Sequence, residues 1–240
     1  MQEKKRGKGR VLMGLGLLLL AVAFVLALRL IKEERDADAS AQKVLALMTA
    51  SASPERTPSP VPDQTPLFTP QPTPSPTPKP LATPRRALFE INPDMEMPIT
   101  VIENHEYIGI LDFPVLELSL PVMSDWSYPK LKIAPCRYKG SAYTGDLIIS
   151  GHNYERHFGR FSSMMLGDEI RFTDVDGNVF RYTVCAKETL DMRNVQGMLE
   201  GEWDMTLFTC VPGGAKRVTL RCRLEEYEIA PEKEKTANKQ

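Results

Sequence analysis

Apolar and polar residues are arranged differently in different parts of the chain, and each pattern predicts a different element. Residues 11–28 form an unbroken, uncharged and mostly apolar run, and Arg29 is the only charge before Lys32. A helix rises about 1.5 Å per residue, so a segment over 11–31 would be on the order of 30 Å long, enough to cross a bilayer. This pattern predicts a transmembrane anchor over residues 11–31.

The segment before the apolar run, residues 1–10, sets the expected orientation. Its charged residues are one acid, Glu3, and five bases, Lys4, Lys5, Arg6, Lys8 and Arg10. Basic flanks remain on the cytoplasmic side, so we expect a single-pass protein of the cell membrane with a cytoplasmic N-terminus and an extracellular remainder. A cleaved signal peptide is the alternative, because residues 37–39 have an A-x-A pattern. The length of the apolar run and the charges that follow it favour an uncleaved anchor.

Three further segments differ from the anchor in composition. Residues 32–50 are rich in Glu, Asp, Ala, Lys and Leu, which predicts a helical juxtamembrane segment. Residues 51–86 hold twelve prolines, many in Thr-Pro or Ser-Pro pairs. Proline excludes helix and central strand, and this stretch has little apolar surface to pack, so it predicts an extended linker. The polar residues 230–240 predict a disordered tail.

Residues 87–229 show the alternation that is typical of short strands, and they are expected to form one domain. The strand-like runs are Tyr107–Phe113, Leu116–Val122, Asp146–Ser150, Glu169–Thr173, Val179–Ala186, Met205–Cys210 and Arg217–Leu224. One helix is expected around Glu155–Met165, with a buried face made of Phe158, Phe161, Met164 and Met165. Many short strands with one or two short helices predict a mainly β fold that closes, or nearly closes, into a barrel.

Charge and cysteine content narrow the classes of function. The net charge of −1 argues against a nucleic-acid partner, whose binding surface would be basic. The chain has four cysteines, without a CxxC or a Cys/His zinc pattern. Cys222 lies on the apolar face of an alternating run, so we expect it to be buried. Cys136 follows a proline in a polar segment, and its environment is left open.

The run Thr206-Leu207-Phe208-Thr209-Cys210 places a thiol at the end of an apolar strand. If Met205–Cys210 and Arg217–Leu224 form a hairpin, Cys210 faces Arg217, with about 5 Å between the two Cα atoms. Arg221 would lie near Thr206, about 13 Å further along the strand, and we expect it to be exposed. An arginine beside a cysteine can donate hydrogen bonds to an oxyanion, so this register selects Arg217.

A thiolate near neutral pH needs a neighbouring imidazole or another positive charge. The chain has three histidines. His105 lies in a polar segment and is expected at the surface, and His157 lies inside the expected helix. His152 follows the apolar run Leu147–Ser150 and Gly151, where a side chain can project from the rim of a sheet. His152 is therefore the leading candidate for the base, with His157 as the reserve candidate, although a lone histidine is more often structural or exposed.

Together, the Thr-Cys run at 206–210, Arg217 and the Gly-His-Asn triplet at 151–153 resemble a sortase, the cysteine transpeptidase of Gram-positive cell surfaces. The resemblance spans roughly residues 104–228. It implies an eight-stranded barrel with His152, Cys210 and Arg217 as catalytic residues. It also implies that the connection 187–204 recognises the substrate. The residues expected to contact substrate are Asn153, Thr209, Met192, Val195 and Leu199. The apolar residues of the connection could equally form a minor core.

The resemblance implies that Cys210 cleaves a C-terminal sorting signal and that an amine then releases the thioacyl intermediate. The implied partners are surface proteins that carry the signal, a peptidoglycan precursor or a pilin lysine, and the plasma membrane. No metal or cofactor is expected, because residues 139–146 hold a single acid and residues 174–178 lack a calcium-loop spacing. The subclass is class B-like or class D-like. The alternatives are a purely hydrolytic cysteine peptidase and a non-catalytic ectodomain that binds the cell wall or partner proteins. A papain-like enzyme is disfavoured, because its cysteine precedes its histidine.

Overall fold

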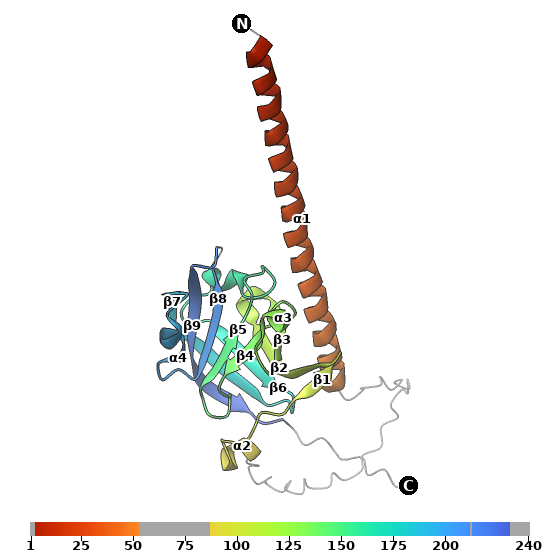
Figure 1. Cartoon of the computed structure of the whole chain (residues 1–240). Helices are drawn as coiled ribbons and strands as arrows, with labels where there is room; N and C mark the ends of the chain where they lie inside the picture. The colour runs from red at the N-terminus through yellow and green to blue at the C-terminus, as the bar shows by residue number, and fades with distance from the viewer. Residues whose placement is uncertain (1–2, 53–86, 212, 231–240) are drawn as a thin grey trace, which may run out of the picture.

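The computed structural model describes residues 3–52, 87–211 and 213–230, which form one long helix and a barrel of short strands beside its C-terminal part (Figure 1). The linker predicted over 51–86 and the tail predicted over 230–240 fall almost entirely outside these residues.

Helix α1 (Glu3–Ala52) runs without a break through both the predicted anchor and the predicted juxtamembrane helix. Its segment Met13–Ala50 is long and apolar enough to cross a membrane, and its most apolar stretch, with a mean hydropathy of 2.6, is not buried. After this stretch, the side chains of Ala37, Ala41, Val44 and Met48 are buried. Their spacing places them on one face of the helix, and this face packs against the barrel.

The barrel closes because β2 pairs with strands on both of its sides. The strands are β1 (Thr100–Ile102), β2 (His105–Phe113), β3 (Leu118–Met123), β4 (Cys136–Lys139), β5 (Leu147–Ser150), β6 (Glu169–Asp174), β7 (Val179–Asp191), β8 (Met205–Cys210) and β9 (Lys216–Glu228). Their order is β1-β2-β3-β4-β5-β8-β9-β7-β6, and β6 also pairs with β2. Strands β2 to β9 therefore form the ring and β1 is an addition to it, which confirms the prediction of an eight-stranded barrel.

Alternating side chains fill the inside of the ring, as the strand patterns predict. In β6, Ile170 and Phe172 are fully buried, and in β5, Leu147 and Ile149 point into the same core. Cys222 is fully buried there as well, which confirms its predicted environment. Cys136 lies in a smaller cluster under α1. The sulfhydryl groups of all four cysteines are free.

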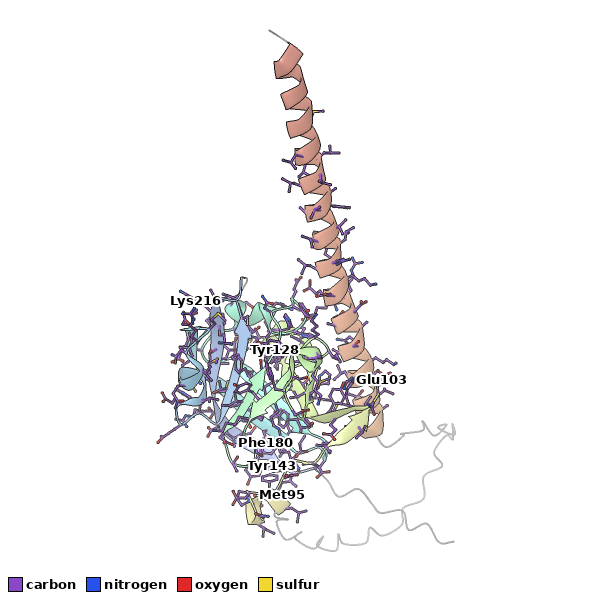
Figure 2. All side chains as sticks on the ribbon, viewed as in Figure 1. Met95, Glu103, Tyr128, Tyr143, Phe180 and Lys216 are labelled. Carbon is purple, nitrogen blue, oxygen red and sulfur yellow. The ribbon has the colours of Figure 1, made fainter. Side chains whose placement is uncertain are left out.

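Short helices precede or connect the strands of the barrel. They are α2 (Leu88–Ile91), η1 (Pro114–Leu116), α3 (Tyr128–Leu131), η2 (Gly159–Ser163) and α4 (Val195–Leu199). In Figure 2, Phe180, Tyr143 and Met95 mark the end of the barrel near α2, and Lys216 marks the opposite end.

The helix predicted around Glu155–Met165 is wrong, because this segment contains turns and the short 3₁₀ helix η2. The backbone N–H of Phe158 turns back to donate to the carbonyl of His152 at 3.0 Å. Gly159 fits against this turn, where a Cβ atom would approach the carbonyl oxygen of Asn153 to 2.6 Å. Phe158, Phe161 and Met164 are buried as expected, whereas Met165 is exposed.

Candidate active site

Three adjacent strands, β5, β8 and β9, bring the predicted catalytic residues together. β5 runs parallel to β8 with Ser150 opposite Phe208, and β8 runs antiparallel to β9 with Cys210 opposite Arg217. Continuing the β5 register by two residues aligns His152 with Cys210. This continued register would place His152 in a row with Cys210 and Arg217, across strands about 4.8 Å apart. We call these three residues the rim row, because they lie where β5 and β8 end and β9 begins.

The rim row lies on the outer wall of the barrel. Aligned residues of paired strands point to the same face, and alternate residues along a strand share that face. Ile148 and Phe208 therefore lie on the face of the rim row, and they pack with Met198 of α4 in a cluster outside the main core. This arrangement leaves one end of the outer wall open at Cys210, which is exposed.

Cys210 differs from the other thiols in both exposure and neighbours. Burial raises the pKa of the Cys136 thiol to about 12, and burial also raises the pKa of Cys222. Neither group is a nucleophile at neutral pH. Cys185 is exposed but lies inside β7. Cys210 ends its strand and combines exposure with a facing arginine, which is the setting that a reactive thiol requires.

His152 is held by the turn that follows β5. The N–H of Gly151 donates to the carbonyl of Phe208 at 3.0 Å, which extends the pairing of β5 and β8 toward the histidine. The His152 ring stacks on Tyr154, with 4.1 Å between ring centroids, and its Nδ1 lies 3.3 Å from the amide oxygen of Asn153. Burial lowers the pKa of His152, and the contact with Asn153 partly opposes this effect. The imidazole is therefore neutral at pH 7 and able to accept a proton.

His157, the reserve candidate, is buried beneath this turn. Its side chain is 1% exposed, and its ring centroid lies 5.5 Å from that of Tyr154. Burial lowers the pKa of His157 to about 4, with a smaller contribution from His152. Neither ring nitrogen has a hydrogen-bond partner within the described part of the chain. His152 is therefore the more accessible of the two histidines, and its role as the base stays a prediction.

Arg217 lies beside Cys210 and keeps guanidinium N–H groups available for further hydrogen bonds. It donates one hydrogen bond through Nη1 to the carbonyl of Met192, and its guanidinium lies 5.9 Å from the centre of the Phe208 ring. Its Nε is buried and has no partner among the residues that the structure describes. An arginine carries five N–H donors, so this side chain can still bind a carbonyl oxygen or an oxyanion placed over Cys210.

Residues 111–225 match the family model of the sortase domain. The chain carries a sortase domain. Sortases are cysteine transpeptidases, and the matched segment includes the whole rim row. No curated protein matches the chain.

Solved sortases are among the structures similar to this chain. Sortase A from Corynebacterium diphtheriae is 19% identical, with 51% of this chain and 62% of that chain covered and a TM-score of 0.47. Sortase A from Listeria monocytogenes is 23% identical, with 52% and 91% covered and a TM-score of 0.47. The sortase D5 transpeptidase from Clostridium perfringens is 19% identical, with 50% and 79% covered and a TM-score of 0.44. This chain therefore spans less than two thirds of the Corynebacterium protein.

The sortase domain has a second arginine below the rim row, whose strand position was predicted correctly and whose exposure was not. Arg221 lies opposite Thr206, as predicted, but it is 2% exposed and not at the surface. Its guanidinium donates to the carbonyls of Met198 and Gly197, to Thr206 Oγ1 at 3.1 Å and to Glu188 at 3.2 Å. Helix α4 covers this part of the wall, so Arg221 holds α4 against β8.

The residues predicted to contact substrate in the sortase domain lie in three settings. Asn153 is next to His152 and half-buried. Met192 and Val195 are 46% and 41% exposed and lie on the connection that Arg217 contacts, whereas Leu199 packs on the cluster under α4. Thr209 is buried and points to the face opposite Cys210. Of the five, Leu199 packs on the outer wall, and contact of all five with substrate stays a prediction.

Sequence reasoning did not single out Tyr154 as part of the site. The position of Tyr154 two residues after His152 was the available signal, because aromatic side chains commonly stack on neighbouring rings. No cluster of three potential metal ligands occurs among the residues that the structure describes.

Proposed function

We propose that this chain is a membrane-anchored sortase-type transpeptidase. It cleaves a C-terminal sorting signal and transfers the surface protein to an amine of a peptidoglycan precursor or of a pilin lysine. The observation that carries this proposal is the rim row within a sortase domain, where the exposed thiol of Cys210 is aligned between His152 and Arg217. The apolar, unburied stretch of α1 supports the anchor.

The chemistry follows from the three groups. The Cys210 thiol gives its proton to His152, and the thiolate attacks the carbonyl carbon of the scissile peptide bond. His152 then passes the proton to the leaving amine, so that the C–N bond breaks and a thioester remains. An incoming amine attacks the thioester, gives a proton to His152 and releases the thiol. Arg217 stabilises the oxyanion of each tetrahedral intermediate through guanidinium N–H groups other than the one that binds the Met192 carbonyl.

The signal peptide would lie along the outer wall beside α4. Exposed side chains of Met192 and Val195 offer apolar contacts there, and Leu199 lies next to them. A short apolar signal segment could bury part of this surface, at about 25 cal/mol for each Å² removed from water. The amine acceptor would approach from the open end, where Cys210 is exposed.

The test is to incubate the full chain in detergent micelles with a panel of sorting-signal peptides, with and without amine acceptors, and to identify products by mass. We expect one class of signal to be cleaved and the acyl part to appear on the amine. Release of free acid alone, at saturating amine, would assign the chain to the hydrolytic peptidases. Absence of any thioacyl adduct at Cys210 across the panel would contradict the proposal.

A further inference from the structure

The part of α1 that follows the predicted anchor is packed against the barrel, at the end where the rim row lies. Figure 1 shows α1 passing along the barrel, with its N-terminal half projecting beyond the end at which β8 and β9 meet. Residues 33–48 make all the contacts described below, and we call them the arm. None of the sequence patterns predicted that the arm would touch the domain.

The arm is attached by an apolar seam along one face of the helix. Ala41 is 1% exposed and belongs to the main core cluster. Val44 and Met48 pack in a second cluster with Tyr107 and Met123 of the barrel. Beside this seam, Lys43 forms an ion pair with Glu103 in the turn before β2, and Figure 2 shows Glu103 beside α1.

At its other end the arm contacts the turn that carries His152. The Glu34 carboxylate accepts a hydrogen bond from the backbone N–H of Glu155 at 2.6 Å. Asp38 forms an ion pair with Arg156, with 3.3 Å between Oδ2 and Nη1. These two acids are four residues apart, one turn of helix, so both lie on the side of the arm that faces the turn. A charge-assisted bond to a backbone N–H restrains the main chain of the turn itself.

Charges at the start of the arm also act on the aromatic pair in the site. Burial raises the pKa of Tyr154, and the carboxylates of Glu33 and Glu34 raise it further. Tyr154 stacks on the His152 ring. The restrained turn, the stacked tyrosine and the histidine therefore form one continuous assembly that begins at the arm.

From these contacts we propose that the arm belongs to the catalytic domain and contributes to catalysis, with Glu34 as a positioning residue for His152. Glu34 follows the predicted span 11–31 by three residues, which is about 5 Å along a helix. The arm therefore also keeps the rim row close to the membrane surface, whatever the length of the linker that follows.

Docking of the arm can be tested without any enzymatic assay. In the full chain in detergent micelles, with Cys185→Ser and Cys210→Ala removing the exposed thiols, Ala41→Cys and Gln42→Cys are compared for their rate of maleimide labelling. Ala41 is buried in the seam and Gln42 is exposed on the same turn. We expect labelling at position 41 to be slower by about tenfold or more, because a thiol must be exposed to react. Equal rates would overturn the docked arm.

The positioning role is tested by kinetics and rests on the proposed transpeptidase function. Glu34→Ala should lower kcat by about 3- to 10-fold and leave KM unchanged, because it removes one hydrogen bond to the turn and nothing near α4. Glu34→Gln, which keeps an acceptor oxygen, should recover most of kcat. Lys43→Ala, which removes the ion pair with Glu103 and leaves the turn at Glu155 untouched, is the matched control and should match the unaltered chain.

The outcomes separate the two proposals. Equal kcat values for Glu34→Ala and Lys43→Ala, or a rise in kcat on loss of Glu34, would overturn the positioning role. If no signal peptide is turned over by the unaltered chain, the proposed function fails, whereas the labelling result still decides whether the arm is docked.

Discussion

Arg217 and Arg221 lie four residues apart on the same face of β9, but the surroundings of their side chains differ. Arg217 lies at the rim beside an exposed thiol and keeps a free donor. Arg221 is covered by α4, and its guanidinium is engaged by two carbonyls, a hydroxyl and a carboxylate. The comparison teaches that position along the strand, and not residue type, separates an arginine available for chemistry from one that holds the wall together.

The histidines repeat this division between rim and interior. His152 is half-buried and aligned with Cys210, whereas His157 is sealed under the turn with no partner for its ring within the described residues. A buried polar group without a partner costs stability. Substitutions of His157, like those of Arg221, should therefore change the stability of the fold. The predictions below use this contrast between the rim row and the layer beneath it.

The largest effect is expected at the centre of the rim row. Cys210→Ala should lower turnover of a cleaved signal peptide by about 10⁴-fold or more, because no thioester can form. The melting temperature should remain unchanged, since the side chain is exposed. Cys185→Ala, which removes the other exposed thiol, is the control and should keep full activity. If Cys210→Ala turns over peptide at a substantial rate, Cys185 becomes the candidate nucleophile.

The next largest effect separates the two arginines directly. Arg217→Ala should lower kcat by about 10²- to 10³-fold through loss of an oxyanion donor, with an unchanged melting temperature. Arg223→Ala, on the same strand, removes a half-exposed arginine that packs on Trp203 and should change kcat little. Comparable losses in both variants would contradict the selection of Arg217 by the hairpin register.

Substitution of Arg221 should change the stability of the fold. Arg221→Leu should lower the free energy of unfolding by about 3 kcal/mol, because two carbonyls and Thr206 lose their buried donor. Denaturant unfolding of the full chain measures this, with Arg217→Leu as the matched substitution at the rim. A loss of stability that is as large for Arg217→Leu would remove the distinction between rim and interior.

The smallest effect is a pH dependence that His157 imposes on stability. Its pKa in the folded chain is about 4, below the value of about 6.5 for an exposed histidine, so the unfolded state binds the proton more tightly. The stabilising effect of the neutral ring is complete above pH 6.5 and decreases as the pH falls toward 4. Between pH 7.5 and 4.5 this decrease should be about 2–3 kcal/mol.

Unfolding at the two pH values measures the effect. His157→Phe, which has no titrating group and fits an aromatic site, should lose less stability over the same interval. His105→Phe replaces a half-exposed histidine at the start of β2 and serves as the control. An equal pH dependence for His157→Phe and the unaltered chain would show that another group is responsible.

Local pattern in the sequence was sufficient for much of the fold and for two of the three residues of the rim row. The alternation in Met205–Cys210 and Arg217–Leu224 and the short connection between them determine the hairpin register, so the pairing of Cys210 with Arg217 was predictable. The same alternation predicted the buried position of Cys222. These features depend on neighbours close in sequence, where backbone geometry leaves few choices.

Tertiary structure decided what depends on segments distant in sequence. The alignment of His152 with Cys210 requires β5 and β8 to be parallel neighbours, although β6 and β7 separate them along the chain. Burial of Arg221 requires α4 to fold over the wall, so an alternating pattern that looked solvent-facing became an interior one. Docking of the arm requires small residues of α1 to meet the barrel. Contacts of this kind are selected by packing in three dimensions, where total burial outweighs any local preference.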